Sequence, residues 1–192
     1  MNAIDRNFRP ALPDAIEAEQ AREFLDYDRL TGVLTWRRRD RKWFATDRNW
    51  RIWNTRFAGT VAGSPDKKGY LRIAILSRSY KAHRLAYLIV TSNWPPHQID
   101  HQNHVLCDNS WENIRPATSA ENGKNTSISV RNTSGAMGVH WHRKCQKWCA
   151  QINLNGASTH LGLFATKAEA AAARKRAEAE HGFHENHGRV AA

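Results

Sequence analysis

The pattern of apolar and polar positions divides the chain into short helices and strands separated by turns. In the first half, the apolar positions lie close together over short runs, and glycine, proline and "DKKG" (66–69) mark turns between them. Two prolines after residue 93 would stop a helix, because proline cannot continue one. The expected elements are a helix over 14–30 that ends near Asp28, strands over 32–39 and 70–76, and a buried helix over 83–90.

The pattern changes from Gly138 onward, where three short apolar runs alternate with turns. They predict strands over 138–143, 147–156 and 158–164, with Asn155-Gly156 as a hairpin signal. A helix should follow, because Thr166 and Glu169 form a capping box and Gly182 is a plausible C-cap. Its alanines give a flat face that can lie close against a sheet. The last part of the chain is therefore expected to be a small domain that folds alone.

Between these halves lies a polar stretch, Ile99–Asn125, that is rich in asparagine. Asparagine forms helices and strands poorly, so the stretch is either a loop or a site that needs amide oxygens. Within it we expect a strand end, a turn at Pro116 and a helix start at Ser119.

Charge points to a polyanionic partner. The 192 residues carry a formal net charge of +11, with a pI of about 10.1, and 41% of them are hydrophobic, enough for a packed core. Residues 36–84 contain fourteen Lys or Arg against three Asp or Glu, and residues 131–192 contain nine against four. Two separate basic regions are expected if both lie along one long nucleic acid, although a merely solvated basic surface is the alternative.

The cysteines and the apolar runs exclude several classes. Cys107, Cys145 and Cys149 are three in number and form no C-x-x-C pair, which disfavours a disulfide framework and fits a reducing cytosol. No apolar run approaches the roughly 20 residues of a membrane span, and the N-terminal residues show no signal-peptide pattern. We therefore expect a cytoplasmic protein without a membrane partner.

The polar stretch resembles the HNH nuclease motif, the ββα-metal fold, in the homing-endonuclease branch whose last position is asparagine. The resemblance rests on Asp100-His101, on D-N-x-x-x-N-x-R (108–115) and on E-N-x-x-N (121–125), and it covers residues 80–125. It implies that His101 is the general base and that Asp100 and Asn122 are metal ligands. Asn113 would orient the histidine and hold the loop.

Phosphodiester hydrolysis suits these residue types, since it needs a base near an activated water and a cation on the phosphate. A carboxylate and an amide oxygen are hard ligands, which favours one Mg²⁺ or Mn²⁺ per active site. Two alternatives remain open: a polar loop with incidental spacing, and a zinc cluster of His97, His101, His104 and Cys107. Asn103, Asn109 and Asn125 are interpreted as turn and helix-end residues.

Residues 138–173 resemble the plant ethylene-response-factor (APETALA-type) DNA-binding domain, in which a three-stranded sheet enters the major groove and a helix packs behind it. The resemblance rests on Gly138-Val139, Trp148, Leu161-Gly162, Phe164 and the alanine-rich helix. Trp141 and Trp148 are expected in the core. The DNA-facing positions here hold few arginines, so the plant family's target sequence does not transfer. Those positions are His140, His142, Lys147, Asn153, Ser158 and His160, with Arg143 and Lys144 in the turn.

The N-terminal region is predicted to contact DNA as well. Trp36–Phe44 interleaves aromatic and basic residues and could track phosphates, while a solvated loop is nearly as plausible. His83 could touch phosphate, or it could be structural. The predicted DNA-binding residues of this half are Arg37, Arg38, Arg39, Arg41, His83 and Arg84.

The sequence thus predicts an α+β protein with three parts: a basic extension (1–79) rich in strands, a central ββα-metal HNH nuclease unit (80–128), and a sheet-and-helix DNA-binding domain (129–192). The predicted function is metal-dependent cleavage of double-stranded DNA, by a monomer that nicks one strand, in a phage or mobile-element setting. A sequence-specific DNA-binding protein without catalysis is the main alternative, and an RNA-binding or structural phage protein is a third.

Overall fold

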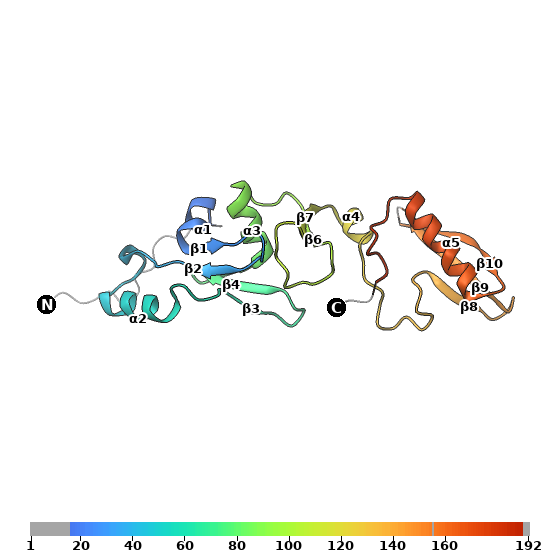
Figure 1. The fold of residues 1–192 in the computed structure, drawn as a ribbon, viewed down its shortest axis with the longest axis horizontal. Coiled ribbons are helices and arrows are strands. Elements are labelled where there is room, and N and C mark those ends of the chain that lie inside the picture. The colour runs from blue at the N-terminus through green and yellow to red at the C-terminus, as the bar shows by residue number, and fades with distance from the viewer. Residues whose placement is uncertain (1–15, 155, 190–192) are drawn as a thin grey trace. The chain divides into compact units, whose positions relative to one another are not determined.

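The computed structural model describes residues 16–154 and 156–189, which form a mixed α+β fold with small antiparallel sheets (Figure 1). It divides into two compact units. The first contains residues up to His101 and Leu106–Arg115, and the second contains Gln102–Val105 and the chain from Pro116. None of the described helices is long and apolar enough to cross a membrane.

The first unit is built from small sheets and three longer helices. Strands β1 and β2 form one antiparallel pair, and β3, β4 and β5 form a three-stranded sheet in that order. Strands β6 and β7 make a further two-stranded sheet, in which β7 runs across the boundary between the units. The bounds are α1 Ala18–Phe24, β1 Leu25–Tyr27, β2 Leu34–Trp36, a 3-10 helix Arg41–Trp43, α2 Asp47–Phe57, β3 Ser64–Pro65, β4 Leu71–Ile75, β5 Arg78–Lys81, α3 Ala82–Thr91, β6 Gln98–His101 and β7 Ile114–Ala117.

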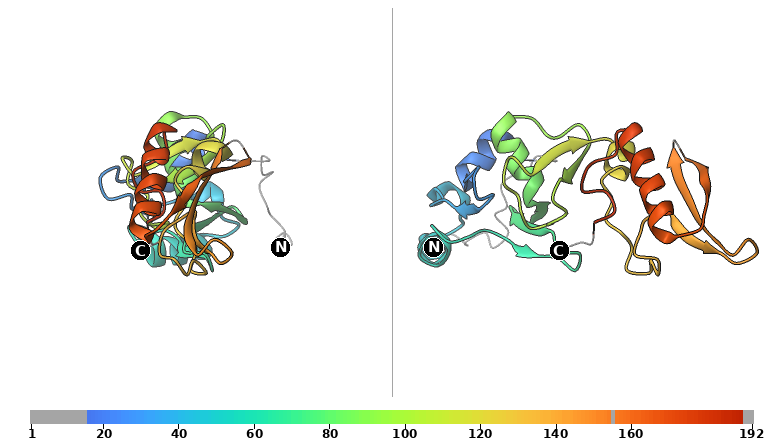
Figure 2. Two further views of the ribbon diagram at one scale, coloured as in Figure 1. Left: turned by 90° about the vertical axis from the view of Figure 1, so that its right-hand side faces the viewer. Right: turned by 45° about the vertical axis from the view of Figure 1, so that its right-hand side comes forward.

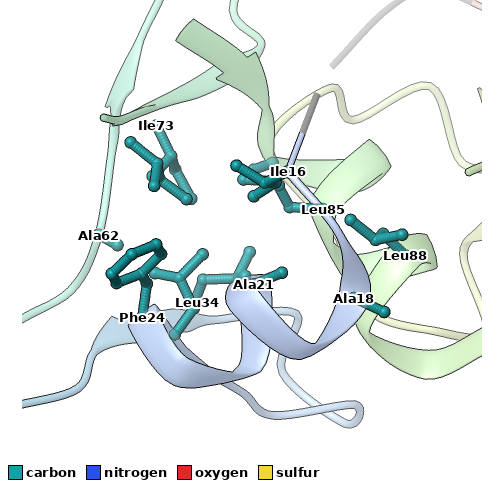
Figure 3. Close-up of a cluster of buried hydrophobic side chains, with 12 residues drawn as sticks. Ile16, Ala18, Ala21, Phe24, Leu34, Ala62, Ile73, Leu85 and Leu88 are labelled. Atoms are coloured by element: carbon teal, nitrogen blue, oxygen red, sulfur yellow. The ribbon is translucent and has the colours of Figure 1, made fainter. Parts of the chain in front are cut away.

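The core of this unit lies where α1, β2, β4 and α3 meet (Figure 3). Phe24 of α1, Ile73 of β4 and Leu85 of α3 are completely buried, and Leu34 of β2 packs with them. A second small cluster joins Ala86 of α3 to Ile99 and Ile114. Because Ile99 lies in β6 directly before Asp100 and His101, this packing fixes the strand that carries both polar residues.

The predicted helix over 14–30 is wrong in its second half, and its first two residues lie outside the described ones. The helix ends at Phe24, and the chain then turns into β1, where Leu25 pairs with Trp36. The Asp28 side chain accepts hydrogen bonds from Leu30 N and Thr31 Oγ1, which closes the turn to β2. Pairing with a distant strand therefore overrides the local helical pattern. The strand expected over 32–39 is confirmed only for Leu34–Trp36.

Helix α2 was not expected from the sequence. It begins after Thr46, whose hydroxyl accepts a hydrogen bond from Asn49 N, a normal N-cap. Four residues face inward with helical spacing, but two of the four positions between them are arginines. The inward-facing residues are Trp50, Trp53, Asn54 and Phe57. The other expected elements here, the strand over 70–76 and the helix over 83–90, are confirmed as β4 and α3.

The second unit has the sheet-and-helix arrangement predicted for the end of the chain (Figure 2). Helix α5 covers one face of the antiparallel sheet β8-β9-β10 and buries Ala170 and Ala177. The capping box of Thr166 and Glu169 is confirmed, while the C-cap is His181, and Gly182 follows with φ 64°. Asn155 of the hairpin turn lies outside the described residues. The bounds are α4 Ser119–Gly123, β8 Val139–His142, β9 Lys147–Leu154, β10 Ala157–Phe164 and α5 Lys167–Glu180.

The segment after α5 folds back onto the residues that follow α4. His184 N donates to Lys124 O at 3.0 Å, and Gly188 N donates to Thr126 O at 2.9 Å. Ile128 N donates to Arg189 O at 3.0 Å. Helix α4 is thereby held in the same compact unit as the C-terminal sheet, whereas the division of the chain after residues 79 and 128 remains a prediction.

One turn assignment in the polar stretch is corrected. Pro116 lies within β7 and not in a turn, and the turn to α4 comes at Thr118. Thr118 Oγ1 accepts from Glu121 N, and the Glu121 carboxylate accepts from Thr118 N, so a capping box starts the short helix as its sequence allows.

Candidate active site

Strand β6 places Asp100 and His101 next to each other with their side chains almost completely buried. Asp100 is 5% exposed and His101 is 3% exposed, which is unusual for residues that can carry charge. Buried polar groups need hydrogen-bond partners, because an unpaired one loses its solvation without compensation. The partners of both residues therefore define what the site can do.

Arg115 of β7 is the charged partner of Asp100. Its Nε and its Nη2 both donate to Asp100 Oδ2, at 3.2 and 3.0 Å. The guanidinium holds the carboxylate in one orientation and compensates its charge. The Arg115 side chain is 37% exposed, so this ion pair reaches from the buried carboxylate towards solvent.

Asn109 is the partner of His101. Asn109 Nδ2 donates to the Cys107 carbonyl at 3.1 Å, and this bond directs the amide oxygen towards His101 Nε2, at 3.3 Å. An amide oxygen can only accept, so Nε2 carries the hydrogen. In the neutral imidazole the lone pair then lies on Nδ1.

Burial lowers the pKa of His101, although the bond to Asn109 and the charge of Asp100 act in the opposite direction. His101 is therefore neutral at neutral pH, the form that can accept a proton. The ring also contacts two others, with centroids 5.0 Å from His83 and 5.8 Å from Tyr70. Burial lowers the pKa of His83 to about 3, and the neighbouring His101 adds to this.

The loop between β6 and β7 is fixed by contacts on several sides. Asn113 Nδ2 donates to Asp108 O at 2.7 Å, which closes the loop on itself. Tyr27 Oη donates to Asn109 O at 2.7 Å, so the β1–β2 hairpin holds it from outside. The backbone approaches Gly32 so closely that a Cβ there would lie 2.2 Å from Ser110 N, and Gly32 has φ 73°. Only glycine fits this contact without strain.

Asn122 lies in α4 and belongs to the second unit, whereas Asp100, His101 and Asn113 belong to the first. Within its own unit, Asn122 sits in the last turn of a helix whose start is capped by Thr118. The adjoining residues are anchored as well: Lys124 Nζ donates to His181 O at 2.8 Å. The C-terminal segment thus restrains the helix that carries Asn122.

The loop that follows His101 is anchored in this second unit by a network of side chains. His104 Nε2 lies 2.9 Å from Asn125 Oδ1, and His104 Nδ1 lies 2.9 Å from Ser127 Oγ. Asn186 Nδ2 donates to Gln102 O at 2.7 Å. Both ring nitrogens of His104 are thus engaged in hydrogen bonds, which leaves no lone pair for zinc.

The zinc alternative is not supported by the described part of the chain. Residues 16–154 and 156–189 contain no group of three or more His, Cys, Asp or Glu side chains that could hold a metal ion. His97, His101, His104 and Cys107 therefore do not form such a group there.

The predicted DNA-binding residues of the first unit differ in their surroundings. Arg37 and Arg38 are exposed, and Arg37 forms an ion pair with Asp26 at 3.6 Å. Arg39 is half-buried, with its guanidinium 3.9 Å from the ring centroid of Trp53. Among the others, Arg41 pairs with Asp47, Arg84 donates to His97 O at 3.2 Å, and His83 is 3% exposed within the ring cluster. Contact of these residues with DNA stays a prediction.

In the second unit, the strand register gathers the predicted DNA-binding residues on one face of the sheet. His142 pairs with Lys147, His140 pairs with Cys149, and His160 pairs with Gln151. Paired residues share a face, and this face is opposite to the one that buries Ala150 and Ile152 against α5. Arg143 and Lys144 are exposed in the β8–β9 turn, and Asn153 is exposed on β9. Trp148 packs against the core as expected. The expectation that Trp141 lies in the core is wrong, because Trp141 is 46% exposed and its ring contacts the edge of Trp148.

Asn109 and Arg115 are the site residues that the sequence analysis did not assign. Both lie inside the D-N-x-x-x-N-x-R pattern, which was the available signal. Spacing alone does not tell which asparagine of this pattern reaches the histidine, because that depends on how the loop closes.

Comparison with known proteins assigns this segment to a family. Residues 80–124 match the family model described as HNH endonuclease, and they contain Asp100, His101, Asn109, Asn113 and Asn122. No curated protein and no solved structure matches the chain. The matched segment extends from the end of β5 to the residue after α4. The chain therefore contains an HNH endonuclease domain at residues 80–124, which supports a nuclease that acts on DNA.

Proposed function

We propose that this protein is a metal-dependent DNA endonuclease of the homing type, with His101 as its general base. The observation that carries the proposal is a buried, neutral histidine whose tautomer is fixed by Asn109 and whose strand neighbour is a buried carboxylate. A protein that only binds DNA has no need of such a buried pair, so the non-catalytic alternative is less well supported.

The resemblance to the HNH motif implies Asp100 and Asn122 as the residues that would hold a divalent cation. They offer a carboxylate and an amide oxygen, which are hard ligands, and Arg115 already orients the carboxylate. Mg²⁺ commonly takes only one or two protein ligands, together with waters and substrate phosphates, so a small donor set suits it. When bound, such a cation neutralises charge on the scissile phosphate.

The protein's own residues then supply base catalysis and orientation. His101 Nδ1 takes a proton from the attacking water while the oxygen of that water bonds to phosphorus. The ester bond to the leaving sugar oxygen breaks, and this oxygen keeps the bonding electron pair and takes a proton from solvent. Asn109 holds the imidazole so that Nδ1 carries the lone pair, and Asn113 keeps the loop that carries Asn109 closed. General-base catalysis of this kind contributes about 100- to 10,000-fold to a rate.

The decisive experiment is cleavage of supercoiled plasmid with defined metals. We expect no cleavage in EDTA and restored cleavage with Mg²⁺ or Mn²⁺. Asn122→Ala should need a higher Mg²⁺ concentration for half-maximal rate, because an oxygen ligand is lost. Asn93→Ala, a change at an exposed asparagine in the first unit, is the matched control. Cleavage that persists after complete removal of metal would contradict the proposal.

Asn109→Ala should reduce the cleavage rate by about 10- to 100-fold, in line with the loss of a residue that orients a functional histidine. Duplex affinity should stay within about two-fold, since ground-state binding does not use this contact. Single-turnover cleavage and fluorescence anisotropy would measure the two effects separately. A rate equal to that of the wild type would show that His101 does not depend on Asn109.

The finer features of the proposal concern DNA selection and product. Residues 129–192, with a net basic charge and the polar sheet face described above, are proposed to bind duplex DNA, as in the ethylene-response-factor-like domain that they resemble. The chain has one Asp-His…Asn…Asn set and therefore one active site, which cleaves one phosphodiester bond each time the protein binds DNA. The proposed product is a nick in one strand, made by a monomer.

A further inference from the structure

Helix α2 has two faces of opposite character. Trp50, Trp53, Asn54 and Phe57 face the protein, and the other seven residues are exposed. Asp47 and Asn49 lie at the two borders with the inner face, and five residues lie on the far side between them. With 3.6 residues per turn, these five fall within an arc of about 140°. They are Arg48, Arg51, Ile52, Thr55 and Arg56, which we call the outer face of α2.

The inner face fixes the orientation of the helix. The backbone carbonyl of Arg39 accepts from Trp50 Nε1 at 2.9 Å and from Asn54 Nδ2 at 3.1 Å, and Arg39 N donates to Asn54 Oδ1 at 2.8 Å. The Arg39 guanidinium stacks over Trp53 and lies 4.9 Å from the ring centroid of Trp36. Burial lowers the pKa of Arg39 to about 10, so the stacked group remains a cation at neutral pH. The helix is thus held rigidly at the edge of the first unit (Figure 1).

The outer face carries three positively charged side chains, those of Arg48, Arg51 and Arg56. Among the residues that the structure describes, no carboxylate lies within ion-pair distance of Arg48, Arg51 or Arg56. Asp47, the acidic residue of the helix, is paired with Arg41, and its charge also interacts with that of Arg51. Between the arginines, Ile52 keeps 54% of its surface exposed. Such a face is complementary to a polyanion that also offers apolar contacts.

We propose that α2 docks in the major groove of duplex DNA and forms a contact surface separate from the C-terminal sheet. The groove is wide enough for a helix, and eleven residues give α2 a length of about 16 Å. Arg51 and Arg56 lie on the two flanks of the outer face, where they reach phosphates on either strand. Arg48, Ile52 and Thr55 lie in the middle and face the base edges, where thymine methyl groups and guanine acceptors are available.

A membrane surface fits this helix less well. Helices that lie in the membrane interface have a broad apolar face, and Ile52 is the one apolar residue on the exposed side of α2, all of which the structure describes. The aromatic residues of α2 point the other way, into the protein.

The identity of the partner, duplex DNA, rests on the proposed function. The choice of α2 as the contact surface rests on the geometry of the helix.

The test compares two double variants of the full chain. Arg51→Ala/Arg56→Ala removes the flanking charges, and Lys67→Ala/Lys68→Ala removes two equally exposed charges from a turn of the same unit. Affinity for a mixed-sequence duplex is measured by fluorescence anisotropy across a series of salt concentrations. Each lost phosphate contact should reduce the salt slope by about 0.9, so the arginine variant should lose about 2 and the lysine variant close to none.

The outcomes separate this inference from the proposed function. A wild-type protein that fails to bind duplex at low salt would overturn both. Binding by the wild type with equal losses in the two double variants would overturn the α2 surface alone, as would a loss confined to binding of phosphatidylserine vesicles. Melting temperatures of both variants should match that of the wild type, and if the arginine variant proves unstable, Arg51→Gln/Arg56→Gln replaces it in the same comparison.

Discussion

Replacing His101 by alanine should lower the rate of DNA cleavage by about 100- to 10,000-fold, the usual contribution of a positioned general base. The reason is that the neutral imidazole, with its lone pair on Nδ1, is the proposed acceptor of the proton of the attacking water. Duplex affinity should change by less than a few-fold, because the base acts in the transition state. Single-turnover cleavage of a labelled duplex, next to an anisotropy titration, measures both quantities.

Two controls make this result interpretable. His97→Ala removes an exposed histidine from the same unit and should leave the cleavage rate unchanged. His101→Asn keeps a buried polar side chain and should be as inactive as the alanine variant, while circular dichroism confirms that it folds. Cleavage by either His101 variant at the rate of the wild type would remove the histidine from the mechanism.

Lowering the pH from 6.5 to 4 should destabilise the first unit by on the order of 3 kcal/mol through His83 alone. Burial lowers the pKa of His83 to about 3, whereas the unfolded chain has the ordinary value near 6.5. Below pH 6.5 the unfolded state therefore binds a proton that the folded state does not. Stability falls as the pH falls through this window and levels off below the folded pKa. His101, whose pKa is also lowered, acts in the same direction.

Urea denaturation at pH 7 and pH 4 would measure this loss, and His83→Phe would isolate its cause. The phenyl ring can keep the edge contacts with Tyr70 and His101, but it does not titrate. The variant should therefore lose much less stability in acid than the wild type does. If wild type and variant lose the same amount, His83 is not the group responsible.

Local signals in the sequence were sufficient for the elements that depend on them. The capping box of Thr166 and Glu169 and the alternation in 138–164 predicted α5 and the three strands, because caps and strand periodicity act within a few residues. The strand β1 was mistaken for helix, since its partner Leu34–Trp36 is fixed only by pairing. Helix α2 was missed because arginines interrupt the apolar pattern, although its aromatic residues recur at helical spacing.

The site could be predicted at the level of residue types, but not at the level of contacts. Asp100 and His101 stand out because an acidic residue and a histidine follow each other before a run of asparagines. Which asparagine meets His101 depends on the closure of a loop that Tyr27 and Gly32 hold from a hairpin about 80 residues earlier. Contacts of that kind have no local signature, so Asn109 was interpreted as a turn residue.

The hydrogen bond from Ile128 N to Arg189 O brings the two ends of the C-terminal sheet-and-helix region to the same place. A region whose two ends lie close together can be inserted as a domain into a surface loop of another protein. Its ends can also be joined and new termini made elsewhere, which is circular permutation. A short linker from Arg189 to Ile128, with new termini in the exposed β8–β9 turn at Lys144, should give a circular permutant that retains the sheet and α5.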